Sequence, residues 1–403
     1  MKKPQLVEEN NVRFLTLFFS VIILAAEASA QTAMPILGIS PSAYLNGMGG
    51  AGAALMTTDP FVIFSNPAQV AANFSRNGVS AHFYPVKTSL LSDRTADLRA
   101  SAMAVGYRIP LRMNESGFRI GLGYITTDLD LGTHTVRDPE GNPVAQSIAS
   151  ENYYGFSLSF AFEYKLILGF GLTYKWVSSE RGQILHPDGS LGRLRDDLGV
   201  FDYGFIAVLP VYGIIFEPAR SFQPFLNVSA GYAKTNIGDD VTYNGELEPL
   251  PLPKTGRIGF AANAGIRTKT RDYELTLISA DWTTERLHPR SLSEPLSARQ
   301  DPLTDIDNQF HMAEKITGFD VKLLETLTYQ QGSYSGADIE DHTSRGIGIG
   351  SGGLFILLRP KYTRNFISFI FEQVEVTYYQ SWYHASTDLQ SIFRGVNIRV
   401  GGF

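Results

Sequence analysis

The feature that most constrains the fold is a strict alternation of apolar residues with small or polar residues. In residues 154–164 every second side chain is aromatic or leucine, and the residues between them are glycine, serine, alanine and one glutamate. Residues 168–176 and 118–124 repeat the pattern. A period of two residues is the signature of a β-strand with two different faces. We therefore expect an all-β fold.

Two environments suit such strands, namely the core of a soluble sandwich and the lipid around a membrane barrel. The segment 154–164 already exceeds the roughly 5 or 6 residues of an average strand in a globular protein. Its apolar face ends in tyrosine on both sides, and its other face is small and polar. Membrane barrels have this pattern, because aromatic rings lie at the lipid headgroups and small or polar residues face the lumen. The prediction is a transmembrane antiparallel β-barrel.

The first part of the chain, residues 1–30, is typical of a secretory signal peptide. Basic residues precede the apolar run 14–26, and Ala28-Ser29-Ala30 is a small-residue cleavage site before Gln31. A short membrane anchor is the alternative, but the run is shorter than the roughly 20 residues that a spanning helix needs. We expect cleavage between Ala30 and Gln31, and a mature chain in the bacterial outer membrane. The count of 0 cysteines fits passage through an oxidising compartment.

The connections between the alternating segments predict the strand count. Long polar connections are expected at 127–151, 179–198 and 286–310, and tight turns at Lys165 and near Arg271. Such alternation of long outer loops with short inner turns is typical of membrane barrels.

The segment 311–332 decides the total. One strand there would turn the polar loop that follows into an inner turn and break the rhythm. Two strands, joined tightly near Leu323, restore the rhythm and give an even number. We predict about fourteen strands within residues 77–403.

The chain ends in an aromatic residue, Phe403. A terminal aromatic is the usual membrane-insertion signal of outer-membrane barrels, so the barrel assembly machinery is an expected partner. Phe403 lies one residue out of phase with Val396, Ile398 and Val400. A β-bulge at 401–402 would restore the alternation.

Residues 31–76 do not alternate. They are rich in small and apolar residues, and 69–73 is expected to form a short helix. The small inward residues of the strands leave volume in a barrel, and 31–76 is the only segment available to fill it. We therefore predict three parts: a signal peptide at 1–30, an N-terminal hatch or plug at 31–76, and the barrel at 77–403.

The hatch contains Gly47-Met48-Gly49-Gly50-Ala51-Gly52, which matches the dinucleotide-binding pattern G-x-G-x-x-G. A dinucleotide site also needs a preceding strand, a following helix and an acidic residue about 20 positions later. No alternation precedes the motif, and no strand–helix–strand unit follows it. We interpret these glycines as packing residues and expect no cofactor.

Three short stretches of the hatch carry a family resemblance. Their residues are Pro35, Ile39, Pro41, Gly47, Met48, Gly49, Ala51, Gly52, Asn66, Pro67 and Ala68. Over about 40 residues the segment thereby resembles the PorV/PorQ group of FadL-like outer-membrane barrels. The resemblance implies a fourteen-stranded barrel whose lumen holds the hatch, with these residues as structural or ligand-lining positions.

Two functions follow from the resemblance as expectations. PorV-like proteins take part in type IX protein secretion and surface attachment, with secreted cargo and secretion-system components as partners. FadL-like proteins take up hydrophobic molecules such as long-chain fatty acids. The secretion or attachment role is the main prediction and hydrophobic uptake is the alternative. In both cases outer-membrane lipid surrounds the barrel.

No constellation of catalytic or metal-binding residues is recognisable. The 7 histidines include no H-x-x-x-H pair, and no serine lies in a G-x-S-x-G setting. His82 is expected to be a polar lumen-facing residue of the first strand. The acidic stretches 239–240 and 305–307 are expected to be solvated loop charges and not calcium sites. No basic stripe indicates nucleic acid. The prediction is a non-enzymatic protein without cofactor or metal.

Overall fold

The computed structural model describes residues 33–74, 77–90, 96–111, 116–185, 189–211, 222–243, 249–269, 274–289, 314–336, 341–353, 373–385 and 390–401. Ala30, Gln31, Asp305, Asp307 and Phe403 lie outside these ranges, so the cleavage site, the insertion signal and the charges at 305–307 stay predictions. Of the other predicted loop charges, Asp239 is exposed as expected, whereas Asp240 is partly buried and lies 3.4 Å from Lys254 Nζ. Among the described residues, no helix is long and apolar enough to cross a membrane.

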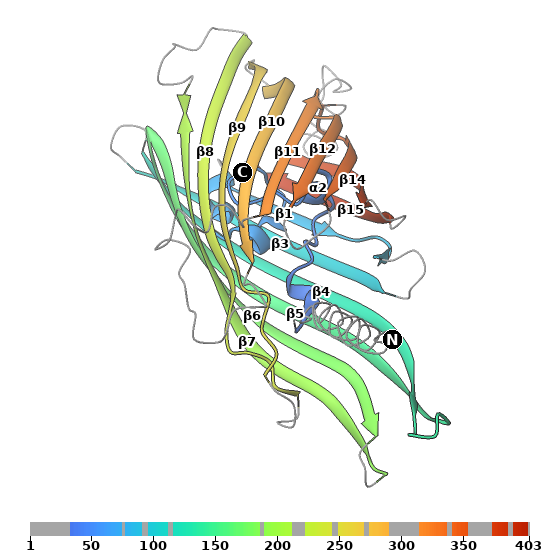
Figure 1. Ribbon diagram of the computed structural model, residues 1–403. Helices are drawn as coiled ribbons and strands as arrows, with labels where there is room; N and C mark the ends of the chain where they lie inside the picture. Colours follow the sequence, from blue (N-terminus) through green and yellow to red (C-terminus); the bar gives the residue numbers. More distant parts are fainter. Residues whose placement is uncertain are drawn as a thin grey trace, which may run out of the picture.

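One closed antiparallel sheet organises the molecule (Figure 1). Its strands in the described ranges are β1 (Gly78–Phe83), β2 (Thr88–Ser89), β3 (Asp97–Pro110), β4 (Gly117–Arg137), β5 (Pro143–Tyr164), β6 (Leu166–Leu185), β7 (Leu191–Pro210), β8 (Phe222–Ile237), β9 (Thr255–Lys269), β10 (Glu274–Pro289), β11 (Glu314–Leu323), β12 (Leu327–Ser335), β13 (His342–Gly350), β14 (Val374–Ala385) and β15 (Gln390–Gly401). Consecutive strands pair in order from β3 to β15.

The strand β1 closes the barrel. It pairs along its whole length with β15 on one side and with β3 on the other. The two-residue strand β2 only extends the edge of β3. In the described part of the chain the closed ring therefore has fourteen strands, which confirms the predicted barrel and its strand count.

The predicted strand pair within 311–332 is present as β11 and β12. Leu323 pairs with Leu327, so only three residues connect the strands. Leu324 and Glu325 have positive φ values of 55° and 50°, the left-handed conformation that tight hairpins require. The rhythm of the connections thus located a turn that contains no glycine or proline.

Two predicted loops are wrong. Residues 127–151 and 179–198 mostly continue the strands β4 to β7. The outward side chains there are mostly polar, whereas Leu129, Leu194 and Leu198 face the lumen, so the apolar outer face that marks a membrane strand disappears although the backbone pairing continues. Bulges at Gly132 and Gly182, with φ of 84° and 100°, bend these extensions.

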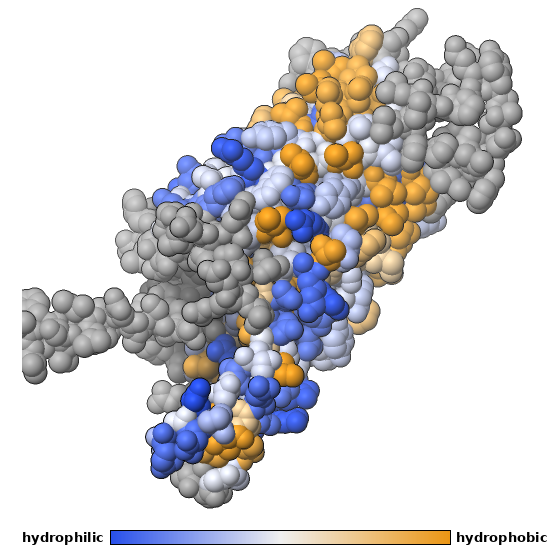
Figure 2. Space-filling view, turned by 90° about the vertical axis from the view of Figure 1, so that its right-hand side faces the viewer, coloured by the Kyte–Doolittle hydropathy of each residue, from blue (hydrophilic) through white to orange (hydrophobic). Residues whose placement is uncertain are grey.

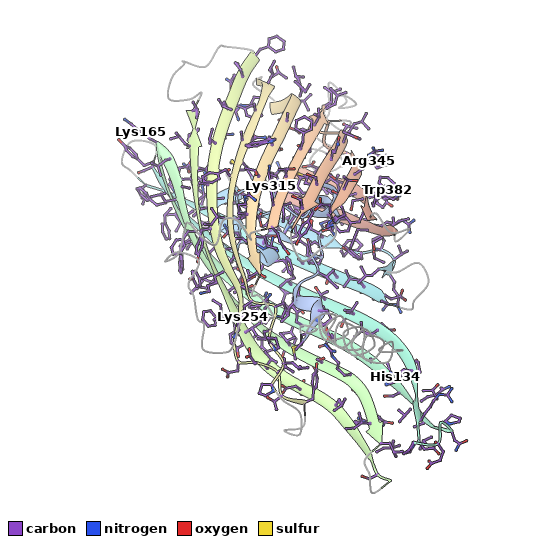
Figure 3. The ribbon with its side chains drawn as sticks, in the orientation of Figure 1. His134, Lys165, Lys254, Lys315, Arg345 and Trp382 are labelled. Carbon is purple, nitrogen blue, oxygen red and sulfur yellow. The ribbon has the colours of Figure 1, made fainter. Side chains whose placement is uncertain are left out.

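The two ends of the barrel differ. Lys165, in the tight turn between β5 and β6, and His134, in the extension of β4, lie at opposite ends (Figure 3). We call the end with the tight turns the inner end and the other the outer end, because outer-membrane barrels have short periplasmic turns. The strands β4 to β7 reach far beyond their neighbours at the outer end (Figure 1).

An apolar belt covers the outer face of the barrel. Exposed side chains on β5 and β6 include Phe156, Leu158, Leu172 and Trp176. The Tyr154 and Trp176 rings stack with centroids 5.2 Å apart. Figure 2 shows apolar patches in the upper half of one side and a mostly hydrophilic lower end, toward the extensions. So much exposed apolar surface on a closed barrel marks a membrane-spanning wall.

The hatch segment, defined here as residues 33–74, lies inside the ring. Its short helices are η1 (Pro35–Leu37), α2 (Ala43–Gly47), α3 (Val62–Ser65) and α4 (Gln69–Asn73), and α4 is the predicted one. Helix α2 contacts β12 to β15, whereas α4 contacts β3 to β7. The segment therefore crosses the lumen from one wall to the other.

Candidate functional site

The hatch backbone touches the wall where the wall has glycine. A Cβ atom on these glycines would overlap hatch atoms in four pairs: Gly171 with Pro67, Gly204 with Asn66, Gly231 with Ala53, and Gly332 with Gly49. No side chain fits in such a contact. The small inward residues noted in the sequence are therefore explained by the close approach of the hatch.

The glycine-rich motif binds a carboxylate of the barrel itself. The backbone N–H groups of Gly52 and Ala53 donate to Glu285 Oε2 at 2.8 and 2.9 Å. Arg257 Nη1 donates to Glu285 Oε1 at 2.9 Å, and Glu285 is 1% exposed. Consecutive backbone N–H groups form an anion-binding concavity. Here a wall residue occupies it, so the motif serves as an anchor and not as a phosphate cradle.

A second part of the motif is fastened by Ser344 of β13. Gly49 N donates to Ser344 Oγ at 2.9 Å, and that hydroxyl donates to Gly47 O at 3.2 Å. Gly49 and Gly50 have φ values of 76° and 86°, which only glycine adopts without strain. Glycine is thus required here by backbone conformation as well as by space.

The Asn66-Pro67-Ala68 stretch joins three pieces of backbone. Asn66 Nδ2 donates to Ala53 O at 2.7 Å and to Phe205 O of β7 at 3.0 Å. Its Oδ1 accepts from Ala68 N at 3.1 Å, just before α4. A single buried amide therefore holds the hatch to itself and to the wall.

The first strand contributes a buried contact between a histidine and an aspartate. His82 Nδ1 lies 2.9 Å from Asp59 Oδ1, and the two side chains are 0% and 1% exposed. Ser42 Oγ donates to Asp59 Oδ2 at 2.5 Å, and Phe61 N donates to Oδ1 at 3.0 Å. Burial raises the pKa of Asp59, but His82 and these hydrogen bonds outweigh it and lower the pKa below its usual 3.8. His82 faces the lumen as expected, and its partner is hatch residue Asp59.

A further set of polar contacts anchors helix α2 to β10 and β11. Tyr44 Oη donates to Asp320 Oδ2 at 2.7 Å and accepts from Lys322 Nζ at 3.1 Å. Lys322 also lies 3.3 Å from Asp281 Oδ2. Burial and the neighbouring Asp320 raise the pKa of Tyr44 well above its usual value, so its hydroxyl stays protonated. Two carboxylates and one ammonium group thus fix one end of the hatch.

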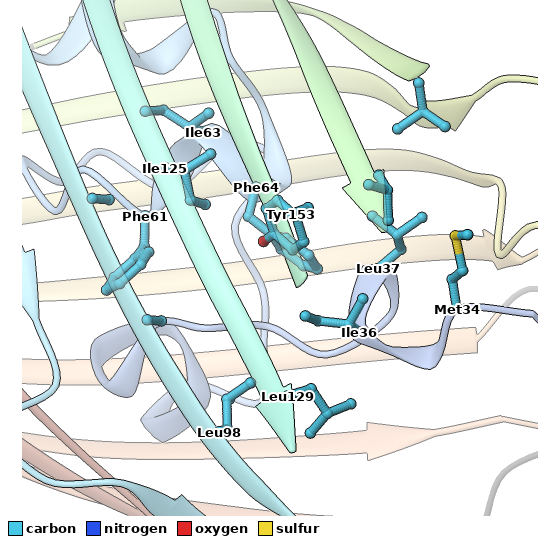
Figure 4. Close-up of a cluster of buried hydrophobic side chains, with 14 of the residues drawn as sticks. Met34, Ile36, Leu37, Phe61, Ile63, Phe64, Leu98, Ile125, Leu129 and Tyr153 are labelled. Atoms are coloured by element: carbon cyan, nitrogen blue, oxygen red, sulfur yellow. The ribbon is translucent and has the colours of Figure 1, made fainter. Parts of the chain in front are cut away.

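Apolar residues fill the part of the lumen that lies toward the outer end of the barrel (Figure 4). The hatch contributes Met34, Ile36, Leu37, Phe61 and Phe64, and the wall contributes Leu98, Ile125, Leu129, Tyr153 and Val200. Leu252, from the outer connection between β8 and β9, joins them, and Ala33 N donates to Pro251 O in this connection at 3.0 Å. We call this cluster the apolar layer.

A polar cavity of about 270 Å³ lies at the inner end. The hatch lines it with Met56, Thr57, Thr58 and Asn73, and β9 to β15 add Asn263, Lys322, Glu375, Asn397 and Arg399 among others. The Arg399 Nη1 and Glu375 Oε2 atoms are 3.7 Å apart. On the side of β9 to β15, the inner end of the lumen is therefore hydrophilic, whereas Ala161, Ile206 and Val208 pack against helix α4 on the opposite side.

The predicted motif residues pack against the wall and not around this cavity. Pro35 and Ile39 are partly buried, and the other nine are buried: Pro41, Gly47, Met48, Gly49, Ala51, Gly52, Asn66, Pro67 and Ala68. None of them is among the described residues that line the cavity. Three residues of the site, Asp59, Glu285 and Lys322, were not predicted from the sequence. Glu285 and Lys322 are charged residues at inward positions of strands, and this was the signal that could have identified them.

The described residues include no group of histidine, aspartate or glutamate side chains that could hold a metal ion. The fold and the filled lumen define a class: a fourteen-stranded membrane-spanning barrel with its N-terminal segment inside.

No family model and no curated protein matches the sequence. Membership in the PorV/PorQ group therefore stays a prediction. Among solved structures, the chain is similar to the Ralstonia pickettii toluene transporter TbuX, with 13% identity, a TM-score of 0.47, and coverage of 92% of this chain and 100% of that chain. It is also similar to the Pseudomonas putida toluene transporter TodX, with 10% identity, a TM-score of 0.41, and coverage of 89% and 96%.

A third similar structure is the monoaromatic hydrocarbon channel CymD, with 12% identity, a TM-score of 0.43, and coverage of 92% of this chain and 99% of that chain. All three likenesses are of barrel architecture only.

Proposed function

We propose that this protein is a non-enzymatic outer-membrane barrel that takes up small hydrophobic molecules through a lumen gated by the hatch segment. The observation that carries the proposal is the order of the two environments in the lumen. A molecule arriving from outside meets the apolar layer first and the polar cavity second. We expect no cofactor.

The closed wall supports a route through the lumen. Every strand of the ring is paired on both sides within the described chain, and the backbone pairing leaves no open strand edge that spans the barrel. The hatch must therefore shift for a molecule to pass. Its helices have at most five residues each, and isolated helices of this length are unstable. Release from the wall would let the segment rearrange.

The apolar layer favours hydrophobic substrates. Contact with it removes apolar surface from water, which contributes about 25 cal/mol per Å². A polar solute would lose its hydration against these side chains, at a cost of about 1–3 kcal/mol per group left without a partner. The charged groups next to the layer, Lys175 and Asp202, are already paired with each other at 2.7 Å. The layer therefore favours apolar over polar solutes. In the polar cavity that follows, an apolar ligand would bind less tightly, which would assist its release.

A substitution in the apolar layer tests this function. Leu37 is 1% exposed within the layer, and the adjacent Gly38 is exposed. We expect Leu37→Asn to lower the uptake of radiolabelled oleate by expressing cells about tenfold, because one buried polar group opposes the ligand. Gly38→Asn should leave uptake unchanged. Heat-dependent gel mobility confirms that each barrel is folded, and equal uptake by folded Leu37→Asn and wild type would refute the proposal.

A second function has its own structural support. The strands β4 to β7 extend past the apolar belt as two long hairpins, with β5 running from Pro143 to Tyr164 (Figure 1). A rigid polar platform outside the membrane suits protein contact better than small-molecule passage. It supports a PorV-like part in type IX secretion or surface attachment, with secreted cargo as the partner.

A further inference from the structure

The outer face of β10 to β15 carries basic side chains and, among the described residues of these strands, no acidic one. The outward-pointing ionisable side chains of these strands are Arg286, Lys315, Arg345, His384 and Arg394, and no acidic residue points outward among their described residues. The acidic side chains of the same strands, such as Asp281, Glu285 and Asp320, are buried on the lumen side. We call the five outward residues the basic crescent.

The crescent lies at the outer boundary of the apolar belt. Arg345 pairs directly with Trp382, and His384 is two residues closer to the outer end. Arg394 likewise lies two residues beyond Val396 on β15. Long basic side chains at this level place their stems along apolar surface and their charge among the headgroups.

A groove on the outer face lies within the crescent. It has a volume of about 280 Å³ and is lined by Tyr329, Arg345, Gly346, Ile347, Trp382 and His384. Figure 3 shows Arg345 and Trp382 close together at the edge of the barrel. The groove thus combines two basic side chains with aromatic and aliphatic walls, which suits an amphipathic molecule.

Two basic side chains of the crescent have no polar partner in the described part of the protein. Arg345 and Lys315 are exposed and have no hydrogen bond or ion pair within the described ranges. Arg394 Nε donates to the neutral Gln380 Oε1 at 3.4 Å. A bound anion would therefore find unneutralised charge at Arg345 and Lys315.

We propose that the basic crescent binds the phosphate groups of a phosphorylated glycolipid in the outer leaflet. Arginine matches phosphate with two parallel hydrogen bonds, and Arg345 offers this fork at the mouth of the groove. Trp382 and Tyr329 give the sugar and the first acyl carbons an apolar surface. The proposal does not depend on what passes through the lumen.

The strands on the other side do not share this charge. Asp128 and Glu180, on β4 and β6, point outward at the corresponding level. A barrel that only prefers anionic lipid in general would not need its basic residues to be confined to one side. We therefore expect a defined site on one side of the barrel.

The test measures the binding of bisphosphorylated lipid A to the detergent-purified barrel by native mass spectrometry. We expect Lys315→Gln with Arg345→Gln to weaken binding about 25-fold, because each surface cation near anionic lipid contributes about fivefold. Lys165→Gln is the matched control, since it removes one exposed cation at the inner end, and it should bind like wild type. Heat-dependent mobility on gels verifies folding of all variants.

Two further probes identify the ligand class. Dephosphorylated lipid A and phosphatidylglycerol should each bind at least tenfold more weakly than bisphosphorylated lipid A. Equal binding of dephosphorylated lipid A would overturn the role of phosphate. Equal binding of phosphatidylglycerol would overturn the glycolipid assignment, and an equal loss in Lys165→Gln would overturn the location.

Discussion

At the scale of single residues, the lumen is held by buried polar groups that satisfy one another. Glu285 accepts two hydrogen bonds from the hatch backbone and one from Arg257. Asp59 is similarly surrounded by His82 and Ser42. Buried charge is stable only with complete partners. Each anchor is therefore strong while assembled and costly once one member is removed.

The Glu285 anchor gives a prediction at this scale. Glu285→Ala leaves two N–H groups and the Arg257 guanidinium without their acceptor, so we expect a loss of about 3 kcal/mol in the free energy of unfolding. Urea unfolding in detergent micelles, followed by tryptophan fluorescence, measures it.

The matched variant for this anchor is Glu285→Gln. It keeps an amide oxygen for the hatch N–H groups, and its loss should be clearly smaller. Equal stability of Glu285→Ala and wild type would show that these hydrogen bonds do not fasten the hatch.

At the scale of elements, strands could be predicted from the sequence where apolar and polar side chains alternate. The two strands within 311–332 were predictable because both alternate against lipid and the loop rhythm required an extra turn. The outer parts of β4 to β7 were not, because they lie beyond the lipid and their outward side chains are mostly polar, while residues such as Leu129 and Leu194 face the lumen.

The anchors were equally hidden from the sequence. Gly52 and Glu285 lie 233 positions apart, and periodicity carries no information on such a pair. The spacing of the glycines did predict a packing role, whereas the residue that they bind follows only from how the strands close around the hatch.

The hairpin of β4 and β5 gives a prediction at this scale. Its outer part, residues 133–148, is paired as a two-stranded ribbon beyond the bulge at Gly132. We expect that replacing 133–148 with a two-residue Asn-Gly turn leaves the barrel folded and oleate uptake unchanged, because the apolar layer lies elsewhere in the lumen. A secretion role instead requires the shortened protein to lose cargo display at the cell surface.

Surface display is measured by protease shaving of intact cells that carry the wild-type or the shortened chain. Unchanged display with the shortened hairpin would contradict the platform as a cargo contact. A loss of oleate uptake in the folded variant would contradict its independence from the lumen.

At the scale of the whole molecule, charge and apolar surface are sorted by direction. The wall is apolar outside, its acidic residues face the lumen or the extensions, and a crescent of cations lies at one outer edge. On the side of β9 to β15, the lumen changes from apolar to polar between its outer and inner ends. The proposed uptake requires the hatch to move within this wall.

A reversible disulfide between hatch and wall tests whether movement of the hatch controls uptake. The chain has 0 cysteines, and a Cβ built at Gly259 of β9 lies 3.5 Å from the Ala54 Cβ of the hatch. That separation suits a disulfide. The nearest atom to the added Cβ is the Ala53 Cβ at 3.1 Å, so this side chain has to shift slightly, whereas the wall glycines described above would overlap hatch atoms outright. Gly259→Cys with Ala54→Cys should therefore join hatch and wall with no other thiol to compete. The two single-cysteine variants are the controls.

Oleate uptake is then measured in the same cells under oxidising and reducing conditions. Gating by the hatch predicts that oxidation of the double variant lowers uptake to the level of cells lacking the protein, and that dithiothreitol restores it. Uptake that stays at the wild-type level with the disulfide formed would contradict the account.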